Sequence, residues 1–268
     1  MNGKLTDQRI LVTGAAGGIG SEIVRQLTAH GASLMLADLD SPALRQLQQK
    51  TGQQAFAGDL GSRDDRSRLI NLLSDRYGAL DGMVYCAGVN AFGLHDAQTD
   101  EQIERILRIN LVAPMQLTRG MIPLLEHGRN PVIVHMGSVF GHIGFPGFSL
   151  YSASKFGLHG YTETLRRELA GGPVKVAWIS PRATRTPINA GVIDDMNSEL
   201  KVNYDPPERV ARAVVNALAH PTREKVIGFP EKWFARINQV FPGIVDRSLF
   251  RQLPVIQKYN AIQKETLR

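Results

Sequence analysis

The chain has 268 residues, which is enough for one large α/β domain or two small ones with a substantial buried core. Its only cysteine, Cys86, excludes an internal disulfide and suits a reducing compartment. The net charge of +6 raises nucleic acid as a partner, but from Lys225 onward eight Lys and Arg stand against three Asp and Glu. A solvated basic surface is the preferred interpretation of that segment, and an acidic membrane and nucleic acid are the alternatives.

The chain begins with a pattern typical of a nucleotide site. Arg9–Val12 is a short apolar run that predicts a strand, and the glycine turn Thr13-Gly-Ala-Ala-Gly-Gly-Ile-Gly20 follows at once, before a helical pattern. Glycines let a backbone approach a pyrophosphate closely, and a helix N-terminus offers free N–H groups and the positive end of its dipole. The strand, turn and helix together favour a dinucleotide site over a simple tight turn.

A second strand is predicted over Ser33–Ala37 and ends at Asp38. An acidic residue about 20 positions after the glycine turn accepts hydrogen bonds from both ribose hydroxyls of NAD and repels the 2′-phosphate of NADP. Asp38 therefore favours NAD. The alternative is that Asp38 caps the helix that starts at Pro42, a role that we prefer for Asp40.

Two further strands follow. A helix over residues 42–50 precedes a strand over 54–57, which leads to Gly58-Asp59-Leu60. Ser62 caps the next helix and Gly78 stops it, and residues 82–88 are predicted as a fourth buried strand with a glycine at its carboxyl end. In a doubly wound sheet, ligands bind at such carboxyl ends.

Thr99-Asp-Glu-Gln102 is a capping box, and it predicts a long amphipathic helix through Leu111. Asn110 lies inside this helix, where asparagine is mildly unfavourable. Either its side chain has a specific role, or it bonds to the nearby backbone as such residues often do. The sequence leaves both interpretations open.

Ser138 and Tyr151 mark the most informative stretch. Pro131–Met136 predicts a fifth strand, and Ser138 follows at its carboxyl end, where a serine either makes a turn or holds a substrate oxygen. In Tyr151-Ser-Ala-Ser-Lys155, which begins the next helix, Tyr151 and Lys155 lie one turn apart on one face. A fixed cation there favours the phenolate, lowers the tyrosine pKa from about 10 and prepares Tyr151 to exchange a proton with an alcohol or carbonyl oxygen.

The last third of the predicted domain contains one long connection. Residues 174–179 predict a sixth strand, and residues 184–204 have little periodicity, which suggests a substrate lid. Asp205, followed by proline, is the predicted N-cap of a helix that ends near His220, and Lys225–Phe229 is the predicted last strand.

The C-terminal tail has apolar residues at helical spacing, interrupted by Pro242, Gly243 and Pro254, so we expect two or three short helices. Packing over the pocket or against a partner subunit is the favoured role, and peripheral contact with a membrane surface is the alternative. No linker or repeat divides the rest. We therefore expect a single dinucleotide-binding and catalytic domain over residues 1–229, with residues 230–268 packed on it as a helical extension.

Met1–Asp7 has no apolar stretch typical of a signal peptide, and no run of roughly 18 apolar residues occurs in the chain. We therefore expect a cytoplasmic protein.

Together these residues resemble the short-chain dehydrogenase/reductase family from about Arg9 to Phe229. The glycine turn matches its cofactor motif, Asp38 its NAD-selecting acid and Asp59 its aspartate near the adenine ring. The family's catalytic tetrad is matched in order and spacing by Asn110, Ser138, Tyr151 and Lys155. The positions that the resemblance assigns to NAD binding are Gly14, Gly18, Ile19, Gly20, Asp38, Asp59, Leu60, Ala87, Gly88, Tyr151, Lys155, Pro181 and Thr186.

The resemblance implies a Rossmann-type doubly wound parallel sheet of about seven strands, with helices on both faces and a C-terminal helical extension. It also implies a homo-oligomer, a dimer or tetramer built on two long helices over about 99–121 and 149–170. We predict neither a metal site nor a nucleic-acid partner.

The implied reaction is NAD-dependent hydride transfer between a secondary alcohol and a ketone. Ser138 positions the substrate oxygen, and Tyr151 takes the hydroxyl proton, or returns it in the reduction. Lys155 lowers the pKa of Tyr151 and binds the nicotinamide ribose, and Asn110 holds the helix geometry and a water. The expected pocket favours a lipophilic substrate because its flanking residues are Phe92, Leu94, Phe140, Ile143, Phe145, Phe148, Ile188, Val192 and Ile193.

Two positions depart from the family pattern. Its Asn-Asn-Ala-Gly turn is here Tyr85-Cys-Ala-Gly88, and its Pro-Gly after the sixth strand is here Pro181-Arg182, whose cation faces either solvent, the pyrophosphate or the substrate. The alternative to an enzyme is a dinucleotide-sensing or scaffolding protein on the same fold, because a fold does not define a function.

Overall fold

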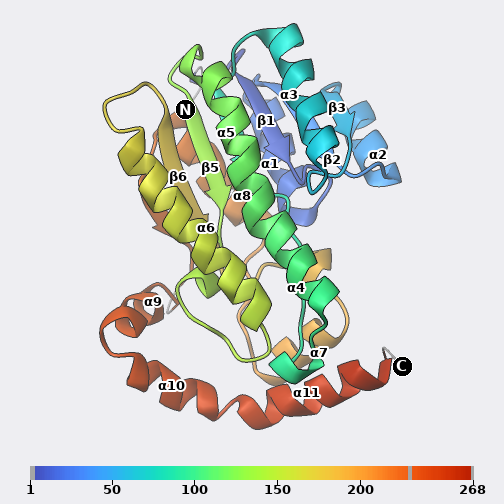
Figure 1. Ribbon diagram of the computed structural model, residues 1–268, viewed down its shortest axis with the longest axis vertical. Coiled ribbons are helices and arrows are strands. Elements are labelled where there is room, and N and C mark those ends of the chain that lie inside the picture. Colours follow the sequence, from blue (N-terminus) through green and yellow to red (C-terminus); the bar gives the residue numbers. More distant parts are fainter. Residues whose placement is uncertain (1–3, 229–230, 267–268) are drawn as a thin grey trace.

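The computed structural model describes residues 4–228 and 231–266, and these residues form a three-layer α/β structure (Figure 1). All seven strands of the central sheet are parallel, in the order β3-β2-β1-β4-β5-β6-β7. The strands are β1 (Arg9–Thr13), β2 (Ser33–Asp38), β3 (Gln54–Ala57), β4 (Gly82–Tyr85), β5 (Val132–Met136), β6 (Lys175–Ser180) and β7 (Glu224–Val226). The predicted doubly wound sheet is confirmed.

Helices cover both faces of this sheet. One face is covered by α1 (Gly18–Ala29), α2 (Pro42–Thr51) and α8 (Pro207–Ala219). The other face is covered by α3 (Arg63–Tyr77), α5 (Ala113–Glu126) and α6 (Ser149–Glu168), and α4 (Asp100–Leu107) leads into α5. The segment predicted to be a lid, residues 184–204, contains α7 (Val192–Glu199).

The strands read as unbroken apolar runs because both faces of the sheet are buried. In β1, Leu11 packs into the core cluster under α3 and α5, whereas Ile10 and Val12 pack into the cluster under α1 and α8. This alternation follows from the two-residue period of a strand, so each residue of β1 stabilises one of the two layers.

The predicted caps of α3 and α4 are present, whereas Asp40 and Asp205 do not cap the helices that follow them. Ser62 accepts from the Asp65 amide, and Gly78 ends α3 in the left-handed conformation at φ 62°. Asp205 does not cap α8, which begins after Pro206 instead, because its carboxylate is bound by two arginines described below. The long helix predicted after the Thr99 capping box is present, since α4 and α5 are joined without a break by a π-helical segment over residues 108–112.

Two strands are shorter than predicted. β4 ends at Tyr85, three residues before the predicted end, because the next two amides, of Cys86 and Ala87, donate to Thr13 Oγ1 at 3.2 Å each. β7 ends at Val226, and the predicted end of this strand, Phe229, lies outside the described residues.

Three helices make up the described part of the tail: α9 (Glu231–Val240), α10 (Pro242–Phe250) and α11 (Leu253–Thr266). They run across one end of the molecule, and α11 passes beneath α7 (Figure 1). Ion pairs from Lys258 to Glu199 and from Lys264 to Asp96, at 2.7 and 3.0 Å, hold α11 in place. The expected domain boundary at 229/230 lies outside the described residues, so that division of the chain stays a prediction. Within the described ranges, none of the helices has the length and hydropathy needed to span a bilayer.

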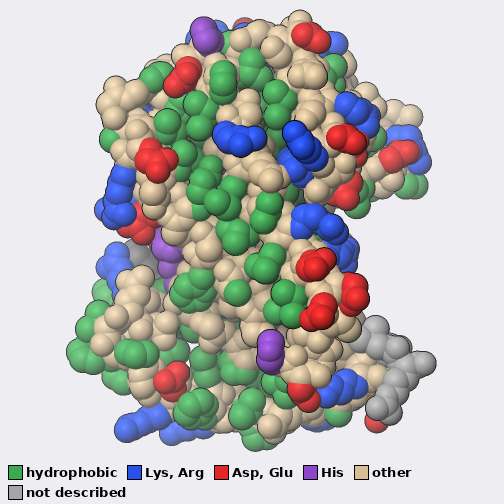
Figure 2. Space-filling view, in the orientation of Figure 1, with side chains coloured by type: hydrophobic (Ala, Val, Ile, Leu, Met, Phe, Trp, Pro, Cys, Tyr) green, Lys and Arg blue, Asp and Glu red, His purple; other side chains and the backbone are tan. Residues whose placement is uncertain are grey.

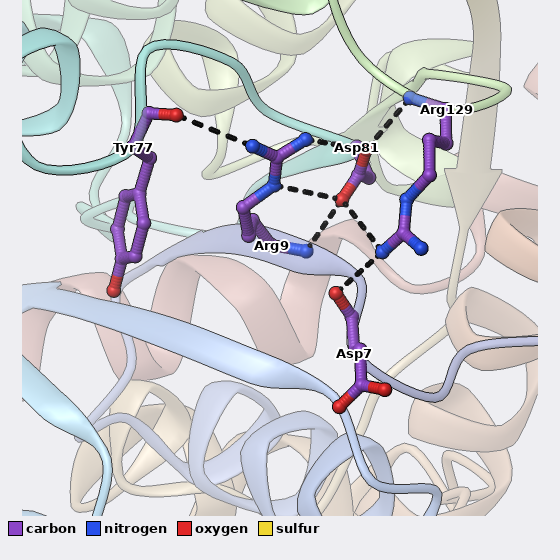
Figure 3. A network of polar contacts seen from close by, with 5 residues as sticks. All are labelled: Asp7, Arg9, Tyr77, Asp81 and Arg129. Carbon is purple, nitrogen blue, oxygen red and sulfur yellow. Dashed lines mark hydrogen bonds and ion pairs between the residues drawn. The ribbon is translucent and has the colours of Figure 1, made fainter.

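A polar network joins the amino ends of the strands (Figure 3). The buried Asp81 carboxylate accepts from the backbone amide and guanidinium of Arg9, at 2.8 to 3.2 Å, and from the Arg129 amide at 2.6 Å. Burial alone would raise the pKa of Asp81, but the hydrogen bonds from Arg9 and Arg129 hold it below its ordinary value. The network ties β1, β4 and the loop before β5 together at the edge opposite the ligand-binding edge.

Candidate active site

A cavity of about 920 Å³ lies at the carboxyl ends of the strands. Its walls come from the ends of β1 to β6, the lid and the tail helices. Every residue that the sequence assigned to cofactor binding or catalysis lines this cavity, with the exception of Asn110. The tertiary structure thus brings together residues that lie as far apart in the sequence as Gly14 and Thr186.

The glycine turn is shaped for close approach of backbone. Gly14 has a φ of +63°, and a Cβ there would lie 2.7 Å from Ala87 Cα. A Cβ on Gly20 would collide with the Gly14 carbonyl oxygen, so only glycine fits either position. No side chain caps α1 and no acidic residue lies in its first turn. Its free amides and positive dipole end therefore suit a phosphate.

Asp38 is held by the glycine turn rather than by a helix. Its Oδ2 accepts from the Ala16 amide at 2.8 Å, and its Oδ1 from the Leu39 amide at 2.8 Å. Ser41 caps α2 by accepting from Leu44, so the capping roles considered for Asp38 and Asp40 were both wrong. A carboxylate fixed at this edge of the cavity can accept from a ribose.

Three other segments complete the cofactor side of the cavity. Asp59 follows β3 and accepts from the Gly61 amide at 2.7 Å, with Leu60 beside it. The Thr186 methyl packs against Gly18, where an added Cβ would lie 2.6 Å away. The start of the lid is therefore in direct contact with the start of α1.

Tyr151 and Lys155 enter the same cavity from the first turns of α6, and Ser138 enters it from the end of β5. The Lys155 side chain is buried, and its Nζ donates to the Met136 carbonyl at 3.0 Å and lies 5.6 Å from the Tyr151 ring centroid. Burial lowers the pKa of Lys155 to about 8. Ser138 Oγ accepts from the Phe140 amide at 3.1 Å, so this serine both makes the turn and faces the cavity.

The pKa of Tyr151 moves in the direction opposite to the predicted one. Burial of the phenol raises it to about 12, and a hydrogen bond with Ser138 only partly opposes the shift. The predicted lowering considered the charge of Lys155 but neglected the loss of water around the phenol. At neutral pH the phenol of this structure is therefore protonated.

Asn110 acts on the backbone behind the cavity. Its side chain is fully buried in the π-helical segment, accepts from the Val89 amide at 2.9 Å and donates to the Val89 carbonyl at 2.8 Å and to Ser154 Oγ at 3.2 Å. The side chain therefore makes specific contacts with residues distant in the sequence, and the catalytic assignment of Asn110 stays a prediction. Asn110 joins the turn after β4 to α6, the helix that carries Tyr151, and π segments often accompany functional sites.

Both departures from the family pattern have a structural explanation. Tyr85 is buried, and its hydroxyl donates to the Ile109 carbonyl at 3.0 Å, so it ties β4 to the π-helical segment. Cys86 lines the cavity, and burial raises the pKa of its thiol to about 12, which makes it unreactive.

Arg182 points to Asp205. Its guanidinium donates to Asp205 Oδ1 at 3.0 Å, and the same oxygen accepts from Arg209 at 2.9 Å. Thr184 and Asp205 also form a β-bridge. Arg182 therefore joins the two ends of the lid while its side chain lines the cavity.

The apolar wall was predicted in part. The predicted residues that line the main cavity are Phe140, Ile143, Phe145, Phe148, Ile188 and Ile193. Phe92, Leu94 and Val192 do not line the cavity themselves. They pack behind its wall, in a hydrophobic cluster that also contains the cavity-lining Phe148 and the buried Met196 and Ile256.

The tail forms part of this wall, as the favoured interpretation of packing over the pocket expects, although the sequence analysis did not name the residues. Phe234, Val245, Ser248, Leu249 and Gln252 line the cavity. The last four recur at helical spacing, and this period was the available signal.

One cluster outside the cavity has the residue types of a metal site, which the sequence analysis did not predict. Ligand atoms of His142, His159 and Glu224 lie within 4.8 Å of one another. However, His142 Nε2 accepts from the Trp178 indole at 3.3 Å and lies 3.1 Å from Ser180 Oγ. Its lone pair is therefore already engaged.

Known proteins are similar to this chain in sequence. A family model described as short chain dehydrogenase matches residues 8–197. The uncharacterized oxidoreductase YxnA of Bacillus subtilis (strain 168) is 32% identical over 255 residues, which cover 91% of this chain and 72% of that protein. The ketoacyl reductase HetN of Nostoc sp. (strain PCC 7120) is 29% identical over 264 residues, which cover 94% and 91%.

A solved structure is similar in fold. The short chain dehydrogenase from Burkholderia cenocepacia J2315, in complex with NADP, has a TM-score of 0.75 and 25% identity, and the match covers 85% of this chain and 99% of that one. The family model spans more than half of the chain, and the fold and the cavity agree with it. The protein therefore belongs to the short-chain dehydrogenase family of oxidoreductases, whose members use nicotinamide cofactors.

Proposed function

We propose that the protein is an NAD(H)-dependent oxidoreductase that transfers hydride between a secondary alcohol and a ketone, with Tyr151 as general acid and base. The observation that supports this most is that Tyr151, Lys155 and Ser138 line the same cavity as the glycine turn and Asp38. A group that exchanges protons and a site for a hydride acceptor thus face the same substrate.

In the oxidation, Ser138 orients the substrate oxygen and Tyr151 takes its proton. The glycine turn and Asp38 would hold the nicotinamide cofactor, which would supply the acceptor for the hydride of the carbinol carbon, so that one alcohol and NAD⁺ would give one ketone, NADH and one proton. Because burial raises the pKa of Tyr151 to about 12, proton removal depends on positive charge near the phenol, which Lys155 supplies. In the reduction, the protonated phenol is the form that donates.

The experiment that tests this proposal is a turnover screen over secondary alcohols and ketones with both cofactors. Tyr151→Phe removes the proton-exchanging hydroxyl and is expected to lower turnover by about 10²- to 10⁴-fold while NADH still binds, as measured by fluorescence titration. Tyr161→Phe, which changes another α6 tyrosine outside the cavity, is the matched control. A Tyr151→Phe enzyme with unchanged turnover would show that the mechanism is wrong, and a wild type that binds NADH without any turnover would favour a sensing protein.

We also propose that NAD is the preferred cofactor, because the fixed Asp38 carboxylate accepts from a ribose and repels a 2′-phosphate. Asp38→Ala is expected to reduce the preference for NADH over NADPH in kcat/KM by about tenfold, or about 1.4 kcal/mol. Asp40→Ala removes a nearby exposed carboxylate that pairs with Arg45 and does not line the cavity, so it should leave the preference unchanged. A wild type that prefers NADPH contradicts the assignment.

The substrate is proposed to be lipophilic because the wall opposite the glycine turn is formed by aromatic and aliphatic side chains.

A homo-oligomer is proposed from exposed apolar side chains on the outer face of the helices that cover the sheet, namely Val112, Met115 and Phe156. Phe156→Glu is expected to lower the molar mass measured by light scattering, and an unchanged mass contradicts this interface.

A further inference from the structure

The outer surface of the tail is unusually apolar. Of the thirteen large hydrophobic side chains that are exposed among the described residues, six lie in the 18 residues from Trp233 to Phe250. Figure 2 shows hydrophobic side chains gathered at the lower left of the molecule, where α9 and α10 lie, with Lys and Arg side chains at the lower margin. Isolated exposed apolar residues are common, but a concentration of this kind marks a contact surface. We call the surface of α9 and α10 made by Trp233, Val240, Phe241, Ile244 and Phe250 the tail surface.

Helix α10 has an inner face toward the cavity and an outer face. In α10, Val245, Ser248 and Leu249 recur at helical spacing and line the cavity. On the other side of the same helix, Ile244, Arg247 and Phe250 are exposed. A helix on a protein surface normally has a polar outer face, but α10 exposes two large apolar side chains, Ile244 and Phe250, beside Arg247 and Asp246.

Arginines are interspersed with these apolar side chains. Arg236 lies 5.9 Å above the Trp233 ring on α9, and Arg247 and Arg251 are exposed on and next to α10. Asp246 is the only acidic residue between Trp233 and Arg251. Aromatic side chains flanked by cations match the boundary between acyl chains and anionic headgroups. A second copy of the same surface fits less well, because a two-fold contact would bring these arginines close to one another.

We propose that the tail surface docks on an anionic lipid bilayer and that the cavity behind it receives its substrate from that bilayer. The apolar side chains enter the acyl boundary, and Arg236, Arg247 and Arg251 bind lipid phosphates. Since the inner face of α10 is part of the cavity wall, a lipid-soluble alcohol or ketone has a short path from the bilayer to Tyr151. The second half of this inference rests on the proposed oxidoreductase activity, whereas the first half does not.

Docking is tested by flotation of the full-length protein with vesicles of phosphatidylglycerol or of phosphatidylcholine. The wild type is expected to float with the anionic vesicles, and less so as salt is raised. The triple variant Trp233→Ser, Phe241→Ser, Phe250→Ser is expected to lower the partition coefficient by about tenfold or more. Leu72→Ser, an exposed apolar residue on α3, is the control and should float like the wild type.

Charge is tested separately. Arg247→Glu with Arg251→Glu should remove the preference for phosphatidylglycerol, whereas Arg63→Glu on α3 should keep it. A wild type that ignores anionic vesicles, or a triple variant that floats equally well, overturns the proposal. So does a triple variant whose only change is a smaller oligomer, because the tail surface is then a subunit interface.

Substrate delivery is tested with one long-chain secondary alcohol, presented either in phosphatidylglycerol vesicles or in detergent micelles. The triple variant should lose turnover of the vesicle-borne alcohol and keep that of the micellar one, since none of its three changed residues lines the cavity. If the triple variant loses turnover equally with the vesicle-borne and the micellar alcohol, the proposal of substrate delivery from the bilayer is overturned. If no alcohol is turned over in any form, the oxidoreductase proposal fails, while flotation still decides whether the tail surface docks.

Discussion

The two edges of the sheet each bury a charged group, and they treat it in opposite ways. At the amino edge, the Asp81 carboxylate is surrounded by donors from Arg9 and Arg129, and its pKa is lowered. At the carboxyl edge, the Lys155 ammonium is equally buried, but its hydrogen bond goes to the neutral Met136 carbonyl, and its pKa falls to about 8. In the first case the fold stabilises the charge. In the second it holds a charge at some cost, which is typical of functional sites.

The strongest test of this comparison is Lys155→Met. The variant keeps the volume of the side chain and removes its charge, so turnover is expected to fall by about 10²- to 10⁴-fold. The free energy of unfolding is expected to rise, because the folded state no longer buries an ammonium. Lys175→Met, at an exposed lysine near the amino edge, should change neither quantity. A variant that is both active and no more stable would mean that Lys155 is an ordinary structural residue.

Asp81→Ala should show the reverse pattern. The variant removes the acceptor of two backbone amides and two guanidinium groups, and we expect the free energy of unfolding to fall by about 2–3 kcal/mol in urea denaturation. This value is at the lower end of the range that is usual when one partner of a buried ion pair is removed. The guanidinium groups can regain water, because the side chains of Arg9 and Arg129 are 27% and 60% exposed. The kcat/KM of the folded fraction should stay unchanged. A large loss of kcat/KM at unchanged stability would contradict the structural role, and Asp75→Ala on the surface of α3 is the control.

The dependence of the free energy of unfolding on pH should also differ between the two edges. This effect is expected to be smaller than the effects of the substitutions themselves. The stabilisation by Asp81 is fully present above the ordinary carboxyl pKa of about 3.9 and is lost as pH falls through the lowered folded value. The wild type should therefore be more stable than Asp81→Ala at neutral pH, and this difference in the free energy of unfolding should be lost only in acid.

For Lys155 the sign is the opposite. Between its folded pKa of about 8 and its ordinary value of 10.5, the unfolded chain binds the extra proton, so stability rises with pH. The free energy of unfolding of the wild type, which is expected to be lower than that of Lys155→Met, should approach the value of the variant over this pH range, as measured by denaturation curves. A constant difference from pH 7 to 11 would show that burial does not perturb Lys155.

Features that depend on neighbouring residues in the sequence were predicted well. Ser62, Gly78 and the Thr99 capping box occupy the predicted positions because a cap acts within one helical turn. The buried strands were found from their apolar runs, since a sheet covered on both faces needs no alternation. The boundaries at Tyr85 and Pro206 were missed because Thr13 and Arg182, which are distant in the sequence, compete for the same groups.

The candidate site divides in the same way. The sequence by itself determined which chemical groups are present: a glycine turn before a helix, an acid at the end of β2, and a tyrosine and lysine one turn apart. Their identity and spacing reflect local geometry, which a short segment specifies alone. The tertiary structure decided their environment. The pKa of Tyr151, the pairing of Arg182 with Asp205 and the cavity wall supplied by α10 all depend on burial by segments far along the chain, and burial is a property of the packed molecule.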